Sequence, residues 1–209
     1  MDNGKLGLYG PEDSRYLNLV ARRAEAEGIK TAWVDGPTPG CVAYVADTDA
    51  GWPMWDMTSE EDVDCIQQTG LSCCAAVVFL YIRYVCSLRR GQRVCIIGRG
   101  HAVQGLTVMW HNMGLHDKYN LDQCSSTALD MGYRVSRADI IVNSADAVTE
   151  EVLDAVDALS TVIDISGSME PLHDRVADYV PRDYVGAWNI AELLRRVRVR
   201  IEEESETDG

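Results

Sequence analysis

The chain has 209 residues, of which 46% are hydrophobic and 25% charged, so it is long enough for one large domain or two small ones with a sizeable core. Its 33 acidic residues outnumber its 19 basic ones and give a net charge of −14. This charge argues against unaided binding to nucleic acid or to an anionic membrane, and it requires any bound phosphate to be held by local groups.

The cysteines and the apolar runs indicate the compartment. Seven cysteines are present without a Cys-x-x-Cys pair, which is typical of a reduced, cytoplasmic protein with neither a zinc site nor a disulfide framework. The first residues form no apolar leader, and the longest apolar run, around 75–82, is too short to cross a bilayer.

The first third of the chain predicts a small α/β body. Short strands are expected over 5–9, 31–34 and 41–46, and a helix that Gly28 ends is expected between the first two. The acidic stretch over 47–64 follows and is expected to be a loop with little regular structure.

The middle and last parts predict a parallel sheet with helices on both faces. An apolar helix over 73–88 is expected to be buried, and the unbroken apolar run Val94–Ile97 is typical of a strand covered on both faces. Strands joined by helices at this interval favour right-handed parallel α/β connections. The other expected elements are a helix over 103–113, strands over 119–124, 140–143 and 161–165, a helix over 149–159, a final helix from Gly186, and a disordered acidic tail over 204–209.

A glycine turn directly follows the strand over 94–97. Gly98 and Gly100 let the backbone bend tightly and approach a pyrophosphate, and the start of the next helix offers free N–H groups. The third glycine of the usual dinucleotide fingerprint is replaced by Val103, and the next glycine is Gly105. The alternative interpretation is a strand-to-helix connection that binds no ligand.

Several motifs in the same order resemble the bifunctional methylenetetrahydrofolate dehydrogenase/cyclohydrolase family. The family's cofactor loop reads G-R-S-x-x-V-G-x-P, its later strands read A-D-I-x-V and V-I-D-V-G, and its linker reads D-V-D-G. The matching segments here are G-R-G-H-A-V at 98–103, R-A-D-I-I-V at 137–142, V-I-D-I-S-G at 162–167 and D-V-D at 62–64, with weaker matches at 14–20, 72–75 and 185–191.

The resemblance implies a small α/β lobe completed by the C-terminal helix and a Rossmann lobe. It places residues 1–72 and 187–203 in the first lobe and 73–186 in the second. It implies a dehydrogenase that passes hydride between NADP and a folate-type one-carbon substrate, and it allows a homodimer.

The cofactor side of the family pattern is well matched. The residues that the resemblance assigns to the cofactor are Gly98, Arg99, Gly100, His101, Val103 and Ser126. The strand over 119–124 ends in serines and a threonine instead of the acid that would read a ribose hydroxyl, which favours NADP, although NAD is also an option. The alternative for Arg99 is a solvated turn residue.

The substrate side departs from the family. Tyr16 and Asp64 match the family's polar residues and are the candidate catalytic groups, but Val20 stands at the position of the family's acid/base lysine. Cyclohydrolase activity is therefore expected to be lost. The alternatives are that Tyr16 is a core residue and Asp64 a cap, and that the protein is a catalytically silent relative that binds a dinucleotide or a protein partner.

The segment Gly51–Trp55 stands where the family has a substrate-pocket segment rich in leucine and proline. Its two tryptophans, Trp52 and Trp55, either fill that pocket or stack on a ligand ring.

Overall fold

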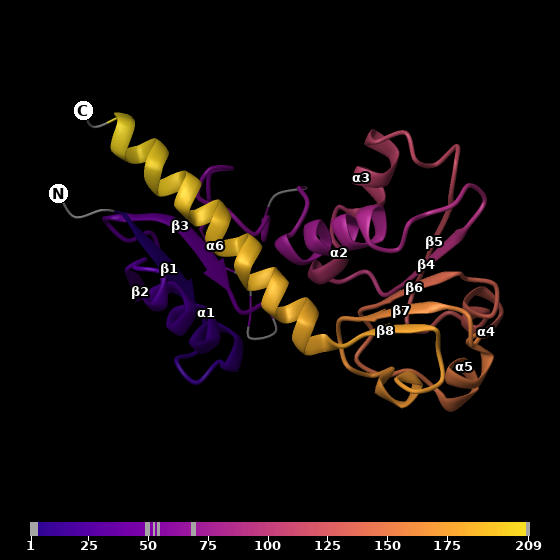
Figure 1. Ribbon diagram of the computed structural model, residues 1–209. Helices are drawn as coiled ribbons and strands as arrows, with labels where there is room; N and C mark the ends of the chain where they lie inside the picture. Colours follow the sequence, from indigo (N-terminus) through magenta and orange to yellow (C-terminus); the bar gives the residue numbers. More distant parts are fainter. Residues whose placement is uncertain (1–3, 49–50, 52, 54, 68–69, 208–209) are drawn as a thin grey trace. The chain divides into compact units, whose positions relative to one another are not determined.

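The computed structural model describes residues 4–48, 51, 53, 55–67 and 70–207. The chain divides into two units, and each consists of helices packed on a parallel sheet (Figure 1). The first unit contains residues 1–73 and 190–209, and the second contains residues 74–189. No helix in the described part of the chain is long and apolar enough to cross a membrane.

The first unit is built on a three-stranded parallel sheet in the order β2-β1-β3. Its strands are β1 (Lys5–Tyr9), β2 (Thr31–Val34) and β3 (Cys41–Ala46). Helix α1 (Arg15–Ala26) begins at Ser14, whose hydroxyl oxygen accepts the Leu17 N–H at 3.1 Å. This cap satisfies one of the free donors at the start of the helix.

The C-terminal helix completes the core of the first unit. Helix α6 runs over Arg182–Thr207, and its side chains Leu193, Leu194 and Val197 are buried against those of β1, β3 and α1. The predicted fold class, a parallel α/β chain with a small lobe that the last helix completes, is confirmed.

The acidic tail contradicts the prediction of disorder, because α6 continues through Thr207. Arg200 forms i,i+3 and i,i+4 ion pairs with Glu203 and Glu204, and the Ser205 hydroxyl donates to the Ile201 carbonyl at 2.8 Å. Residues 208 and 209 of the expected tail lie outside the described residues. Ion pairs one turn apart offset the repulsion that an acidic run alone would create.

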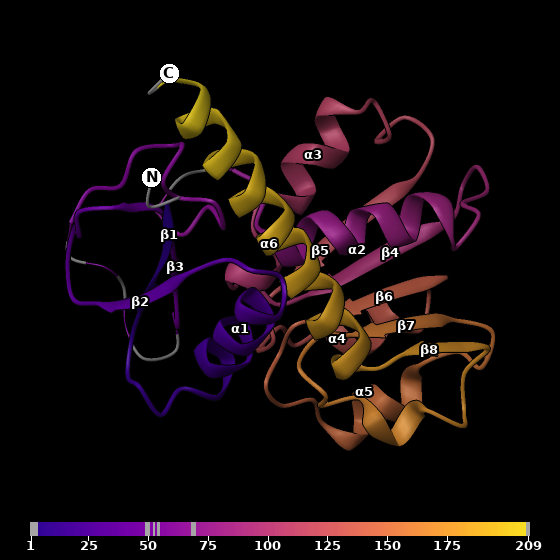
Figure 2. The same ribbon diagram turned by 60° about the vertical axis from the view of Figure 1, so that its left-hand side comes forward.

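The second unit is a five-stranded, fully parallel sheet in the order β5-β4-β6-β7-β8. Helices α2 and α3 lie on one face of the sheet, and α4 and α5 lie on the other (Figures 1 and 2). The strands are β4 (Arg93–Ile97), β5 (Asn120–Cys124), β6 (Ile140–Asn143), β7 (Thr161–Asp164) and β8 (Asp178–Val180); the helices are α2 (Cys73–Tyr84), the 3-10 turn η1 (His101–Val103), α3 (Leu106–Asn112), α4 (Met131–Val135), α5 (Glu150–Ala155) and the 3-10 turn η2 (Glu170–Leu172).

Four predicted helices differ from the structure in their bounds. The helix expected over 149–159 covers only Glu150–Ala155, and the final helix, expected from Gly186, begins at Arg182. The helix expected over 103–113 is interrupted, because Gln104 is extended with ψ 131° and Gly105 has φ +80°, so α3 begins only at Leu106. Helix α2 ends at Tyr84, before the left-handed Ser87, which has φ +48°. A residue with positive φ cannot continue a right-handed helix.

The acidic loop contributes an aromatic cluster to the first unit. The Trp55 ring lies edge-on to the rings of Tyr9 and Tyr44, with centroids 4.9 and 5.7 Å apart. Trp55 therefore packs against the protein in this structure, and Trp52 lies outside the described residues.

Candidate functional site

Gly98 starts the turn that follows β4, and two features of its backbone require glycine. Its φ is +104°, and a Cβ added there would lie 2.3 Å from the Ser144 Oγ. The Gly98 N–H donates to the Cys124 carbonyl at 2.9 Å, which ties the turn to the end of β5. The glycine predicted from the pattern is therefore needed for the fold of the turn, whether or not a ligand binds.

The carbonyl of Gly98 is held by Gln123, which the sequence analysis missed. The Gln123 amide donates to the Gly98 oxygen at 2.9 Å, and its own oxygen accepts the Thr107 hydroxyl of α3 at 3.0 Å. One side chain from β5 thus fixes the turn and the following helix together. The only local signal was a polar residue inside a predicted strand.

The tip of the turn is open. A Cβ at Gly100 would meet no atom within 4 Å, and both Arg99 and Gly100 are exposed. Among the described residues, the N–H groups of Arg99 and Gly100 donate to no protein acceptor, and the Arg99 guanidinium has no ion pair. Free N–H groups and an unpaired guanidinium at an accessible turn are the donors that a phosphate group requires.

The residues after the tip form the short turn η1. The His101 Nδ1 lies 3.2 Å from the Gln104 Oε1, and the Val103 side chain is buried. Val103, which occupies the place of the third fingerprint glycine, therefore anchors the turn to the core, and His101 lies at its partly exposed edge.

Ser126 follows the neighbouring strand at the same edge of the sheet. Strands β4 and β5 are parallel partners, with Ile97 opposite Cys124, so the residues after both strands lie at the carboxyl end. Ser126 is exposed, and the hydroxyl oxygens of Ser125 and Thr127 beside it are 3.0 Å apart. These hydroxyl donors and Arg99 fit a phosphate better than a neutral ribose hydroxyl.

A buried polar network closes the ends of the next two strands. Asn143, the last residue of β6, donates from Nδ2 to the Asp164 Oδ1 at 2.8 Å, and the Tyr179 hydroxyl donates to the Asp164 Oδ2 at 2.7 Å. Asn143 and Asp164 are both fully buried. Burial, followed by the hydrogen bond to Asp164, raises the pKa of Tyr179 and keeps it a donor. The network fixes the loops beside the glycine turn.

Tyr16 and Val20 lie on one face of α1 in the first unit. Tyr16 is partly buried and packs against the core that Val20, with an exposed fraction of 0%, helps to form. The position that carries a lysine in the resembling family is therefore an interior position in this structure.

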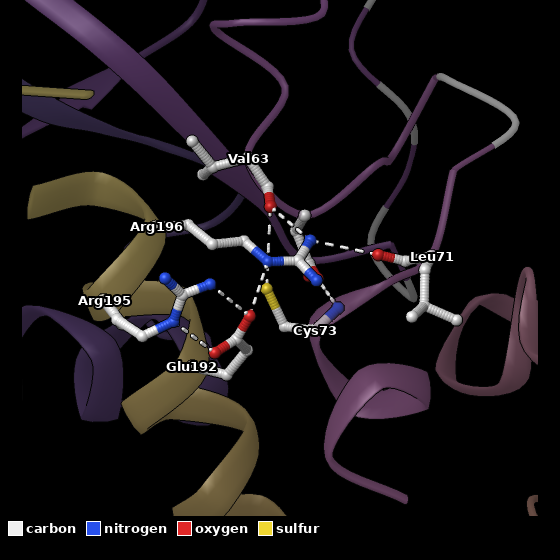
Figure 3. A network of polar contacts seen from close by, with 7 residues as sticks. Val63, Leu71, Cys73, Glu192, Arg195 and Arg196 are labelled. Carbon is white, nitrogen blue, oxygen red and sulfur yellow. Dashed lines mark hydrogen bonds and ion pairs between the residues drawn. The ribbon is translucent and has the colours of Figure 1, made fainter. Parts of the chain in front are cut away.

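Asp64 is nearly buried, with an exposed fraction of 4%, and its Oδ1 accepts the N–H of Cys73, the first residue of α2, at 2.8 Å. Arg196 of α6 holds the chain on either side of this contact. Its Nη1 donates to the carbonyls of Val63 and Leu71, both at 3.0 Å (Figure 3). The Glu192 carboxylate accepts from the Arg196 Nε at 2.9 Å. Asp64 is thus held firmly, and this carboxylate accepts the N–H at the start of a helix.

The structure brings the predicted cofactor residues together at one edge of the second unit's sheet. The two candidate catalytic residues, Tyr16 and Asp64, belong to the first unit, and their approach to the glycine turn stays a prediction. In the described part of the chain no group of three or more His, Cys, Asp or Glu side chains could hold a metal ion.

Comparisons with known proteins rest on structure alone. No protein-family model and no curated protein sequence matches the chain. Among solved structures, the bifunctional methylenetetrahydrofolate dehydrogenase/cyclohydrolase from Campylobacter jejuni superposes with a TM-score of 0.73 at 17% identity, over 97% of this chain and 89% of the other. The chain has the fold of these enzymes. The resemblance predicted from the sequence motifs is therefore confirmed at the level of the fold.

Two further structures agree. The Trypanosoma brucei methylenetetrahydrofolate dehydrogenase-cyclohydrolase, solved with NADP and an inhibitor, gives a TM-score of 0.72 at 18% identity, over 96% of this chain and 86% of that one. A shikimate 5-dehydrogenase from Listeria monocytogenes, in complex with shikimate and NAD, gives 0.56 at 8% identity, over 99% and 96%. The fold is thus shared by dehydrogenases solved with either dinucleotide.

Proposed function

We propose that the protein binds NADP at the glycine turn after β4 and passes hydride between it and a folate-type one-carbon substrate. The observation that carries the proposal is the open tip of the turn. Arg99 and Gly100 present unpaired donors there, whereas the Gly98 N–H already donates to the Cys124 carbonyl. The shared fold supports a nicotinamide dinucleotide as the ligand.

Different groups of the chain are assigned to different parts of the dinucleotide. The N–H groups at the tip of the turn receive the pyrophosphate, and Arg99 with the hydroxyl of Ser126 receives the 2′-phosphate of NADP. Gln123 keeps the turn in place by holding the Gly98 carbonyl. The dinucleotide supplies the hydride chemistry, so the protein must mainly position and orient the reactants.

On the substrate side we assign polar contacts to Tyr16 and Asp64. A phenol and a carboxylate orient a pterin-like ring by hydrogen bonds, and neither replaces a lysine as an acid/base group. With the buried Val20 in that position, the protein is expected to lack cyclohydrolase activity. The alternative is a silent relative that keeps the cofactor site alone. It is favoured by the hydrogen bond that Asp64 accepts from the Cys73 N–H at the start of α2, because this bond explains the residue without a substrate.

Calorimetric titration tests the cofactor. We expect the unmodified protein to bind NADP at least about tenfold more tightly than NAD, and we expect Arg99→Gln to remove this preference, because one charge-assisted contact contributes about 1.4 kcal/mol or more. Arg83→Gln is the matched control, since Arg83 is an exposed arginine of α2 in the same unit. Absence of binding to either dinucleotide at millimolar concentration would remove the proposal.

A spectrophotometric assay of NADP reduction with methylenetetrahydrofolate tests the chemistry. Turnover is expected, and both Asp64→Asn and Tyr16→Phe should lower kcat/KM by about tenfold or more. Asparagine can still accept the Cys73 N–H, so the melting temperature of Asp64→Asn separates a lost contact from a lost cap. Tight NADP binding without turnover would identify the silent relative.

A further inference from the structure

A polar cavity lies in the second unit, at the opposite end of the sheet from the glycine turn. It has a volume of about 290 Å³ and is bounded by the first residues of β4, by the edge strand β5 and by α4. Arg93 and Asn120, which pair across β4 and β5, lie at the amino ends of these strands. Four residue steps of β4 separate Arg93 from Ile97, so the cavity opens about 13 Å from the turn. We call it the arginine pocket.

The lining of the arginine pocket is positive, although the chain is strongly acidic. Arg93, Arg134 and Arg137 line it against a single carboxylate, Asp122, so the lining has a net charge of +2 in a protein of net charge −14. A positive cavity on an acidic protein attracts anions that the rest of the surface repels.

Arg134 forms the fixed wall of the pocket. Its guanidinium pairs with Asp122 and, at 2.8 Å, with Asp130, and its side chain is 31% exposed. Hydrogen bonds to Asp122 and then to Asp130 raise the pKa of Arg134. Arg134 and its two carboxylates together carry a net charge of −1, so the positive charge available to a ligand comes from the other two arginines.

Arg93 and Arg137 have no ion pair among the described residues. The Arg137 guanidinium lies over the Tyr133 ring, 5.1 Å from its centre, and donates to the Tyr133 hydroxyl. The nearby carboxylate of Asp139 accepts the backbone N–H of Arg93 at 2.7 Å, and Asp139 does not line the pocket. The guanidinium groups of Arg93 and Arg137 are thus both available at this cavity, and that of Arg137 is already oriented by the Tyr133 ring.

We propose that the arginine pocket binds the phosphate group of a small phosphate ester or of inorganic phosphate. A guanidinium fork matches a phosphate bidentately, and the Asn120 amide and the Tyr133 hydroxyl are further donors at the same cavity. The volume leaves room for a small organic group beside the phosphate. This site does not depend on the proposed dehydrogenase activity.

Calorimetric titration with inorganic phosphate and with glycerol phosphate, at constant ionic strength, tests the site. The Arg99→Gln variant of the full chain is used as the common background, so that the Arg99 side chain contributes no phosphate binding and the N–H groups of the glycine turn contribute equally in every variant. We expect binding in the millimolar range or tighter. Arg93→Gln and Arg137→Gln should each raise the Kd at least about tenfold, and Arg83→Gln should leave it unchanged.

Control measurements separate the loss of a phosphate contact from a loss of folding. Circular dichroism and the melting temperature verify folding, and Arg137→Lys, which keeps the charge without the fork, should recover only part of the affinity. Tighter binding of glycerol phosphate than of inorganic phosphate assigns the site to an ester. NADP affinity should be unchanged by the pocket substitutions. Phosphate binding that survives Arg93→Gln together with Arg137→Gln, or no binding at about 10 mM, would overturn the proposal.

Discussion

Replacing Gly98 with alanine is expected to lower the free energy of unfolding by about 3 kcal/mol and to abolish dinucleotide binding. The left-handed φ of +104° disfavours any residue with a Cβ, and the added carbon would lie 2.3 Å from the Ser144 Oγ and 3.3 Å from the Ser144 carbonyl carbon. The backbone must therefore move, and the hydrogen bond from Gly98 N–H to Cys124 is lost with it. Urea unfolding and calorimetry measure the two effects.

Two further variants separate strain from ligand contact. Gly100→Ala meets no protein atom and has an ordinary φ of −71°, so its stability should stay within about 0.5 kcal/mol while dinucleotide binding weakens. Ser144→Ala removes the hydroxyl nearest to the added carbon, and in the Gly98→Ala background it should restore part of the stability. A Gly98→Ala protein as stable as the unmodified one would show that the turn tolerates a Cβ.

The strands of the second sheet could be predicted because their signal is local. Val94–Ile97 and Ile140–Asn143 are short apolar runs rich in β-branched residues, and they form neighbouring buried strands. Helix α4 and strand β8 were missed because five and three residues are too short to show a period. Their structure depends on packing against the rest of the sheet.

The candidate site was predictable only where a single backbone feature determines it. Glycine at position 98 signals a tight turn, and that turn is present. Gln123 and Asn143 act through partners about 20 to 25 residues away, Gly98 and Asp164, and no local pattern encodes such a pairing. The helical structure of the acidic tail could not be predicted, because composition does not show that Arg200 pairs with the glutamates one turn later.

Placing a lysine at position 20, where the resembling family carries one, is expected to destabilise the protein without creating cyclohydrolase activity. Val20 has an exposed fraction of 0% and lies among Leu17, Ala24 and Leu194, so Val20→Lys places an ammonium in an apolar core. Desolvation and overpacking should lower the free energy of unfolding by about 3 to 5 kcal/mol at pH 7. Urea unfolding measures this loss, and a methenyltetrahydrofolate hydrolysis assay measures the activity.

The loss of stability in the Val20→Lys variant is expected to depend on pH. Burial lowers the pKa of a lysine below its unfolded value of about 10.4, so the unfolded chain binds the extra proton and the penalty is greatest at neutral pH. The destabilisation should therefore shrink as the pH rises from 7 towards about 10. Leu19→Lys is the matched control, because Leu19 is its neighbour on α1 with an exposed fraction of 50%, and its stability should change by less than about 1 kcal/mol at either pH. A stable Val20→Lys protein that hydrolyses the methenyl bridge would show instead that position 20 opens onto the substrate, and that this one residue separates the chain from a bifunctional enzyme.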